Sequence, residues 1–111
     1  MNQAMNQAIT ILAPIKLAPG RTENDLIAAS DRFQEQFVRH QPGVLRRELV
    51  RRAEGDYLDI IQFRSMDDAE AVMQAERESE VCRAFFEVME IDESSDASES
   101  IDICSSLATY G

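Results

Sequence analysis

The chain has 111 residues and contains no tryptophan, one histidine, four glycines and two cysteines. A metal site needs at least three protein ligands of suitable type, and one histidine with two distant cysteines forms no such cluster, so we expect no metal. Cys82 and Cys104 allow at most one disulfide, which excludes a disulfide scaffold. Glycine-rich phosphate loops and serine nucleophile motifs are absent, and we expect no cofactor.

Basic side chains are also scarce. The chain has 11 of them against 21 acidic ones, which gives a formal charge of −10 and a pI near 4.4. Binding to nucleic acid or to an anionic membrane needs clustered Lys and Arg, so neither partner is expected. The apolar stretch over residues 8–18 is interrupted by Pro14 and Lys16 and is neither a signal peptide nor a membrane span. These absences favour a cytoplasmic location.

The charge that is present is distributed unevenly. Up to Met66 there are nine basic and eight acidic residues, whereas from Asp67 onward there are two basic and thirteen acidic ones. Four arginines lie close together at positions 46, 47, 51 and 52. Arg46 and Arg52 are expected to pair with Glu48, with Asp59 or with acid from the C-terminal half of the same or a partner chain. Alternatively, Arg47 binds an anionic or carbonyl oxygen in a pocket.

Hydrophobic periodicity, capping residues and turn residues indicate the order of elements. They predict a strand over 9–17, a helix over 22–39, hairpin strands over 44–53 and 57–64, a helix over 65–89 that breaks near 78 or 79, and a strand over 101–107. Residues 1–7 are expected to be a flexible segment before a single domain over 8–111. The acidic, serine-rich segment 92–99 is expected to be a solvated loop.

This order is that of an α+β, ferredoxin-like βαββαβ fold, in which both helices pack on one face of an antiparallel sheet. The other face of the sheet is not purely polar in this sequence. Leu12, Val50 and one of the pairs Leu58 with Ile60 or Ile61 with Phe63 must lie there. Exposed apolar sheet surface of this kind is typical of a partner site. We therefore predict a homodimer.

Several short segments fall at landmark positions of a known family. They are Ile15-Lys16-Leu17-Ala18-Pro19-Gly20-Arg21, Gln41-Pro42-Gly43-Val44-Leu45, Gln62-Phe63-Arg64-Ser65 leading into Asp68-Ala69-Glu70, and Ser79 leading to Phe85. In their order and spacing, over roughly residues 8–110, the chain resembles the antibiotic biosynthesis monooxygenase family of the dimeric α+β barrel superfamily.

The resemblance implies a homodimer whose two sheets meet face to face as a barrel. Members of the superfamily range from cofactor-free oxygenases of quinol-like aromatics and haem-degrading enzymes to proteins with no known reaction. The oxidising members rely on an Asn of the first strand, a Trp at the end of the third strand and, in the haem group, a His on the second helix. At the matching places this chain has Thr10, Phe63 and Glu76.

The residues themselves offer candidates for a ligand pocket, although no catalytic residue is evident. The candidates are Arg47, Tyr57, Phe63, Phe33, Phe37, Phe85 and His40. His40 is either a base or ligand or a simple helix-end cap, since an imidazolium is favoured at the C-terminal end of a helix. The aromatic residues either wall a small pocket or form plain core. Cys82 is interpreted as a buried small hydrophobe rather than a nucleophile.

Two functional hypotheses follow. The first is a dimeric, cofactor-independent monooxygenase-like protein that binds a small aromatic or quinone-like molecule beside Phe63 and Tyr57, with Arg47 as a polar donor. The second is a non-catalytic dimeric module of the same fold, which binds a small ligand or a partner. A cavity able to hold a drug-sized molecule favours the first hypothesis, and a filled core around Phe33, Phe63 and Phe85 favours the second.

Overall fold

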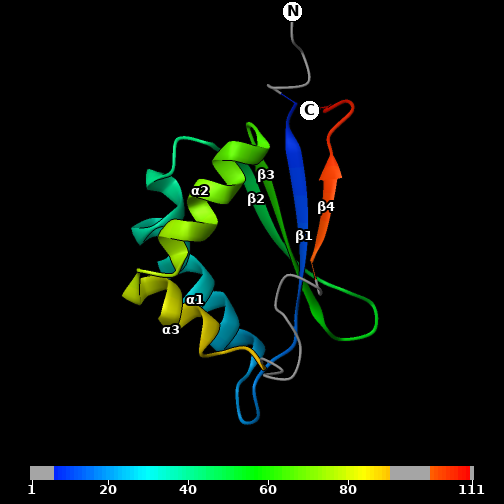
Figure 1. Ribbon diagram of the computed structural model, residues 1–111. Coiled ribbons are helices and arrows are strands. Elements are labelled where there is room, and N and C mark those ends of the chain that lie inside the picture. Colours follow the sequence, from blue (N-terminus) through cyan, green and yellow to red (C-terminus); the bar gives the residue numbers. More distant parts are fainter. Residues whose placement is uncertain (1–6, 91–100, 111) are drawn as a thin grey trace, which may run out of the picture.

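The computed structural model describes residues 7–90 and 101–110, and consists of one antiparallel sheet with its helices on a single face (Figure 1). The elements are β1 (Ile9–Ile15), α1 (Glu23–Gln36), the 3-10 helix η2 (Val38–His40), β2 (Val44–Arg51), β3 (Tyr57–Phe63), α2 (Met66–Glu76), α3 (Glu80–Phe86) and β4 (Asp102–Ser105). The strand order is β2-β3-β1-β4. The expected α+β, ferredoxin-like fold is confirmed.

Strand β1 lies at the centre of the sheet and carries Pro14, a residue that cannot donate to a ladder. On one side β1 pairs with β3 over its whole length, from Ile9 opposite Phe63 to Ile15 opposite Tyr57. On the other side β4 pairs only as far as Leu12. Among the described residues, this side of β1 therefore has no partner strand at Pro14, which is the open edge that a proline in a strand predicts.

The core lies between the sheet and the helices. Alternation along β1 and β3 directs one set of side chains toward the helices, where they are buried with the apolar faces of α1, α2 and α3. The buried apolar residues are Ile9, Ile11, Ile15, Leu26, Phe33, Phe37, Val38, Tyr57, Phe63, Ala69, Val72, Cys82, Phe85 and Val88. Within this core, Phe33 stacks on Phe37 and on Phe85, with ring centroids 5.6 and 4.5 Å apart.

The first helix begins at a capping box. The Thr22 hydroxyl accepts a hydrogen bond from the Asp25 backbone N–H, and the Asp25 carboxylate accepts one from the Thr22 backbone N–H. This arrangement satisfies two donors that a helix N-terminus would otherwise leave unpaired. The helix ends at Gln36, earlier than the expected Arg39, because the chain tightens there into η2 before the turn that leads to β2.

The predicted break in the second helical segment is confirmed. Helix α2 ends at Glu76, and α3 begins after Ser79, whose hydroxyl accepts a hydrogen bond from the Cys82 backbone N–H. A serine in an extended conformation that caps the next helix starts a new helix rather than continuing the old one. The break places Glu76 at the end of α2 and Cys82 in the first turn of α3.

The last strand is shorter than the predicted span of 101–107, because only Asp102–Ser105 joins the sheet. Leu107 is 91% exposed, so its assignment to the strand was wrong. The segment after β4 is held by one backbone bond, from the Ser106 N–H to the Ala8 carbonyl at 2.8 Å, and by side chains. The Ser106 hydroxyl lies 2.6 Å from the Thr10 hydroxyl, and the Gln62 amide donates to the hydroxyls of Ser106 and Thr109 at 3.2 and 3.1 Å.

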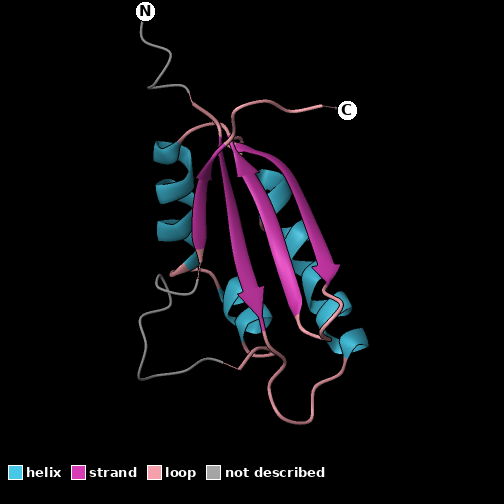
Figure 2. Ribbon diagram, turned by 90° about the vertical axis from the view of Figure 1, so that its right-hand side faces the viewer, coloured by secondary structure: helices cyan, strands magenta, loops and turns pink. Residues whose placement is uncertain are grey.

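The face of the sheet opposite the helices carries no helix among the described residues (Figure 2). Leu12 lies opposite Ile60 in the β1–β3 ladder, and Val50 lies opposite Leu58 in the β2–β3 ladder. All four are half-buried, whereas Tyr57, Asp59 and Phe63 on the helix side of β3 are buried. Of the two pairs left open by the sequence, Leu58 with Ile60 therefore lies on this open face.

Candidate functional site

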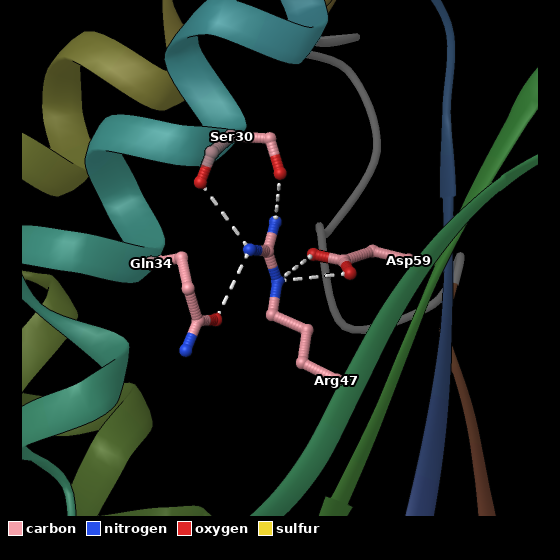
Figure 3. Close-up of polar contacts among 4 residues, drawn as sticks. All are labelled: Ser30, Gln34, Arg47 and Asp59. Carbon is pink, nitrogen blue, oxygen red and sulfur yellow. Dashed lines mark hydrogen bonds and ion pairs between the residues drawn. The ribbon is translucent and has the colours of Figure 1, made fainter.

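Arg47 reaches from β2 into the layer between the sheet and α1 (Figure 3). Its Nε donates to both carboxylate oxygens of Asp59, at 3.0 and 3.1 Å. Its Nη2 donates to the Ser30 hydroxyl at 2.8 Å, and its Nη1 contacts the Ser30 carbonyl oxygen and the Gln34 side-chain oxygen, both at 3.4 Å. The Arg47 side chain is only 6% exposed and the Asp59 side chain 4%. This is a buried ion pair tied to the first helix.

The local sequence explains why Arg47 points inward. The β2–β3 ladder shifts register between Val44 and Arg46, and from there residues alternate between the two sheet faces. Arg47 and Leu49 turn toward the helices, whereas Arg46 and Glu48 pair with each other in solvent at 2.8 Å. The bulge therefore sets which arginine enters the core.

Two aromatic rings hold the guanidinium from the helix side. The Arg47 Cζ lies 4.9 Å from the ring centroid of Phe33 and 5.3 Å from that of Phe85, and these two rings stack at 4.5 Å. A cation over aromatic faces is attracted by the ring quadrupole, and more strongly so when water is excluded. The charge of Arg47 is thus stabilised by one carboxylate and two rings.

Arg47 also lines a groove of about 340 Å³ between α1 and β2, which is open to solvent. The other lining residues are Ile27, Ser30, Asp31, Gln34 and Leu49. A guanidinium has five N–H donors. Four of those on Arg47 have acceptors among the described residues, which leaves one N–H of Nη2 for a ligand. The groove therefore combines two aliphatic side chains with a fixed cation, one carboxylate and two neutral polar side chains.

Two carboxyl groups share the surroundings of this cation. Burial raises the pKa of Asp59 more than the neighbouring Arg47 charge and hydrogen bond lower it. Burial, followed by the negative charge of Asp59, raises the pKa of Glu76 to about 7, although Arg47 acts in the opposite direction. Of the two carboxyls, only Asp59 is hydrogen-bonded to the guanidinium. The site holds an ionisable group that titrates near neutral pH.

Within residues 7–90 and 101–110, the remaining arginines of the group pair with acids of the N-terminal half. Within the described residues, Arg46 pairs with Glu48 at 2.8 Å, Arg51 with Glu23 at 2.8 Å and Arg52 with Asp56 at 2.5 Å. Every one of these acids precedes Met66, as does Asp59. The pairing of Arg46 with Glu48 was expected, whereas the pairing with residues after Met66 was not found. The acidic loop 92–99 lies outside the described residues.

The other pocket candidates are placed as follows. Phe33, Phe37, Phe63 and Phe85 are each at most 7% exposed and Tyr57 is 8% exposed, so all five are part of the core. Phe33 and Phe85 touch the Arg47 guanidinium, but Phe63 and Tyr57 do not line the groove between α1 and β2. The Tyr57 hydroxyl donates to Glu23 at 3.1 Å. As a set these candidates remain a prediction.

The histidine and the cysteines lie away from the groove. His40 is exposed at the end of η2, and its backbone N–H bonds to the Phe37 carbonyl. Cys82 is buried and Cys104 is exposed on the open sheet face opposite Thr10, and both are free thiols. Burial raises the pKa of Cys82, which disfavours the reactive thiolate. No three His, Cys, Asp or Glu side chains in the described part of the chain are grouped to hold a metal ion.

Sequence reasoning missed four members of the site: Ser30, Gln34, Asp59 in its role as the partner of Arg47, and Glu76 as an ionisable neighbour. Ser30 has a signal in retrospect, because it recurs with Leu26 and Phe33 at helical spacing on the apolar face of the first helix. A serine on such a face must find a buried hydrogen-bond partner. Asp59 carried a stronger signal, since it alternates with Tyr57 and Ile61 on the core side of β3. A charge in that position requires a counter-charge.

No family model and no curated protein sequence matches the chain. Solved structures do match it. SnoaB, a cofactor-independent oxygenase from Streptomyces nogalater, superposes with a TM-score of 0.69 at 14% identity, over 93% of this chain and 96% of that one.

Two further structures, provisionally assigned as antibiotic biosynthesis monooxygenases, are equally similar. The protein from Bordetella bronchiseptica has a TM-score of 0.68 at 18% identity, over 94% of this chain and 99% of its own. The protein from Caulobacter crescentus has a TM-score of 0.65 at 17% identity, over 96% of each chain. At these identities the likeness establishes the fold that the resemblance implied. Among the described residues, no helix has the length and apolar character needed to cross a membrane.

Proposed function

We propose, starting from a fold shared with antibiotic biosynthesis monooxygenases, that this protein binds a small aromatic or quinone-like molecule in the groove between α1 and β2 and oxidises it without a cofactor. The observation that carries the proposal is Arg47. It is a buried cation with one N–H that has no acceptor among the described residues, and it lines a groove to which Ile27 and Leu49 add apolar surface.

The groove suits such a ligand in size and chemistry. Its volume of about 340 Å³ lies near the lower end of the roughly 300 to 1,000 Å³ of small-molecule sites. Ile27 and Leu49 supply apolar contact for a ring, and Arg47 supplies a donor for a ring oxygen. Since Asp59 and two phenylalanine rings fix the guanidinium, it is oriented before the ligand arrives, which is how a positioned dipole stabilises developing negative charge.

The chemistry can proceed on the substrate alone. Once a hydroxyaromatic or anthrone loses a proton, its electron-rich anion can reduce dioxygen directly. With an anthrone, one atom of dioxygen enters the ring carbon as a carbonyl oxygen, and the other leaves as water with the two hydrogens of that carbon. The protein has to bind the molecule, hold its oxyanion and accept a proton.

Oxygen uptake with a panel of quinols and anthrones tests the proposal. We expect turnover with at least one member, falling by about tenfold or more in Ile27→Trp, which fills the groove from its exposed rim. Gln36→Trp, on α1 but outside the groove, is the matched control and should retain activity. Equal turnover in both variants, or none in the wild-type protein, contradicts the proposal.

The packed core favours a second candidate, a non-catalytic dimeric module that binds a small ligand or a partner. The Phe33, Phe63 and Phe85 rings are each 2% exposed, and neither Phe63 nor Tyr57 lines the groove between α1 and β2. For this candidate the same panel gives binding without oxygen uptake. Native mass spectrometry of the freshly purified protein separates the two further, because it reports the subunit number and any ligand retained.

We also propose that the protein is a homodimer in which the open sheet faces meet. The four half-buried residues Leu12, Val50, Leu58 and Ile60 form an apolar strip across three strands of that face. A contiguous apolar strip on a sheet face favours association, since burying it removes apolar surface from water. The resemblance to the antibiotic biosynthesis monooxygenase family implies the same arrangement of the two sheets.

A further inference from the structure

Residues 106–110 follow β4 and form an arm that is tied to the open face of the sheet. The Ser106 hydroxyl lies 2.6 Å from the Thr10 hydroxyl. The Gln62 amide donates to the hydroxyls of Ser106 and Thr109, at 3.2 and 3.1 Å. Thr10 and Gln62 lie opposite each other in the β1–β3 ladder, and alternation along both strands directs their side chains away from the helices. The arm therefore has a defined position on this face.

The contact between the arm and the sheet is close. Gln62 is only 8% exposed, although it lies on a face that carries no helix among the described residues. A buried amide needs hydrogen-bond partners, and both hydroxyls that accept from Gln62 belong to the arm. Figure 1 shows the arm leaving β4 on the side of the sheet away from the helices. A molecule that covers this end of the open face therefore contacts the arm as well.

The two large apolar side chains of the arm do not pack on their own chain. Leu107 is 91% exposed and Tyr110 is 90% exposed. The other exposed large apolar residues in the described part of the chain, Ile27, Leu45 and Ile103, are 43 to 54% exposed. One exposed apolar residue is ordinary on a protein surface, but two on an anchored segment beside an apolar strip are typical of an interaction site.

The charge of the arm suits contact with a second copy of this chain. From Asp67 onward the chain has two basic and thirteen acidic residues, so the C-terminal halves of two copies repel each other. Residues 103–110 carry no charge. The arm is thus a part of the acidic half that can lie against another copy without placing like charges together.

The area that a stable dimer needs also favours a contribution from the arm. Stable protein interfaces bury roughly 800 Å² on each partner. The four residues of the apolar strip are already half-buried in the single chain, so covering them removes little further surface from water. Leu107 and Tyr110 are almost fully exposed and supply apolar surface that the strip lacks.

We propose that the homodimer is held by an exchange of arms, in which the arm of each copy packs Leu107 and Tyr110 against the open face of the other copy. The inference rests on the homodimer proposed above. A two-fold symmetric interface contains every contact twice, so the two arms together bury four large side chains. The hydrogen bonds of Ser106 and Thr109 fix the direction of each arm before the copies meet.

Analytical ultracentrifugation of the full chain over a range of concentrations tests the exchange. We expect Leu107→Ser combined with Tyr110→Ser to raise the dissociation constant of the dimer by about a hundredfold or more, because burial of each large apolar side chain strengthens binding by about tenfold or more. Both residues are exposed, so the circular dichroism spectrum should not change. Ile27→Ser, on the helix side of the molecule, is the matched control and should leave the dissociation constant unchanged.

The outcomes separate the arm from the dimer itself. A wild-type protein that stays monomeric overturns both the homodimer and the exchange of arms. A wild-type dimer whose dissociation constant is the same in the double variant overturns the exchange alone, and the homodimer stands.

A photo-crosslink shows which copy the arm touches. Tyr110→p-benzoylphenylalanine places a photoreactive ring on the arm, and unlabelled and ¹⁵N-labelled protein are unfolded together in urea and refolded to mix the copies. We expect crosslinked peptides that join an unlabelled chain to a labelled one. Crosslinks confined to peptides of one label show that the arm packs on its own chain, which overturns the exchange.

Discussion

At the scale of single residues, the burial of a pair decides what it contributes. Arg46 with Glu48, two residues apart on β2, and Arg47 with Asp59, across β2 and β3, are both arginine–carboxylate pairs, at 2.8 and 3.0 Å. The first pair is half exposed or more, at 51% and 55%, and the second is almost fully buried. Water screens the first pair, so its net contribution is small. The second pair cannot lose one member without stranding the other.

We therefore expect Asp59→Asn to destabilise the protein by about 3 to 5 kcal/mol, because Arg47 would remain buried without a counter-charge. Urea unfolding at pH 7 measures the change. Glu48→Gln, which removes the exposed partner of Arg46, should cost about 1 kcal/mol or less. If both substitutions lower the free energy of unfolding equally, burial does not decide what an ion pair contributes here.

Replacing both members of the buried pair separates the charge from the packing. Arg47→Met combined with Asp59→Leu leaves no unpaired charge and keeps an apolar volume in place. We expect the double variant to be more stable than Asp59→Asn alone, and to approach the wild type. Additive losses in the double variant would show that the pair acts through contacts other than charge.

At the scale of elements, Gly43, just before β2, packs against the segment from Arg64 to Asp68 at the start of α2. This contact sets how α2 sits on the sheet. The Arg64 backbone N–H donates to the Gly43 carbonyl at 2.8 Å, and the Arg64 side chain makes two bonds to Asp68, at 2.8 and 2.9 Å. A Cβ at Gly43 would lie 2.5 Å from the Cβ of Asp68. Glycine is needed there for the close approach of the two segments.

Gly43→Ala should accordingly destabilise the protein by about 1 to 3 kcal/mol, since the new methyl group forces β2 and α2 apart. Thermal unfolding followed by circular dichroism measures the loss. Pro42→Ala, one residue earlier and exposed, is the control and should change stability much less. If Gly43→Ala proves neutral, α2 can shift on the sheet at little cost.

The sequence predicted these elements better than it predicted the site. Capping residues and periodicity are local, and they located the first helix at Thr22, the break at Ser79 and the hairpin around Gly55. The partners of Arg47 come from α1 and β3, so they depend on how distant elements pack. The half-buried position of Glu76 depends on that packing too, and its raised pKa reflects burial that no local pattern reveals.

At the scale of the whole molecule, the two faces of the sheet differ. The helices cover one face with a phenylalanine-rich core, and the other face presents Leu12, Val50, Leu58 and Ile60 without a covering helix among the described residues. The strand pairing places Leu12 beside Ile60 and Val50 beside Leu58. A second copy of the chain with the same strip would cover all four.

Light scattering and sedimentation at micromolar concentration should accordingly report a dimer. We expect Ile60→Glu to yield a monomer, because a buried unpaired carboxylate at the centre of the strip opposes association. Ile27→Glu, on the exposed rim of α1, is the control and should remain dimeric. A monomeric wild-type protein would contradict the proposed arrangement.

The buried pair of Arg47 and Asp59 also bears on how this chain can change over evolutionary time. A substitution at either position alone passes through a protein with a stranded core charge, and about 3 to 5 kcal/mol is a large share of the stability of a small domain. Descendants of this sequence should therefore keep both residues or exchange both together. In an alignment deep enough to measure it, positions 47 and 59 should vary as a unit, whereas positions 46 and 48 should drift independently.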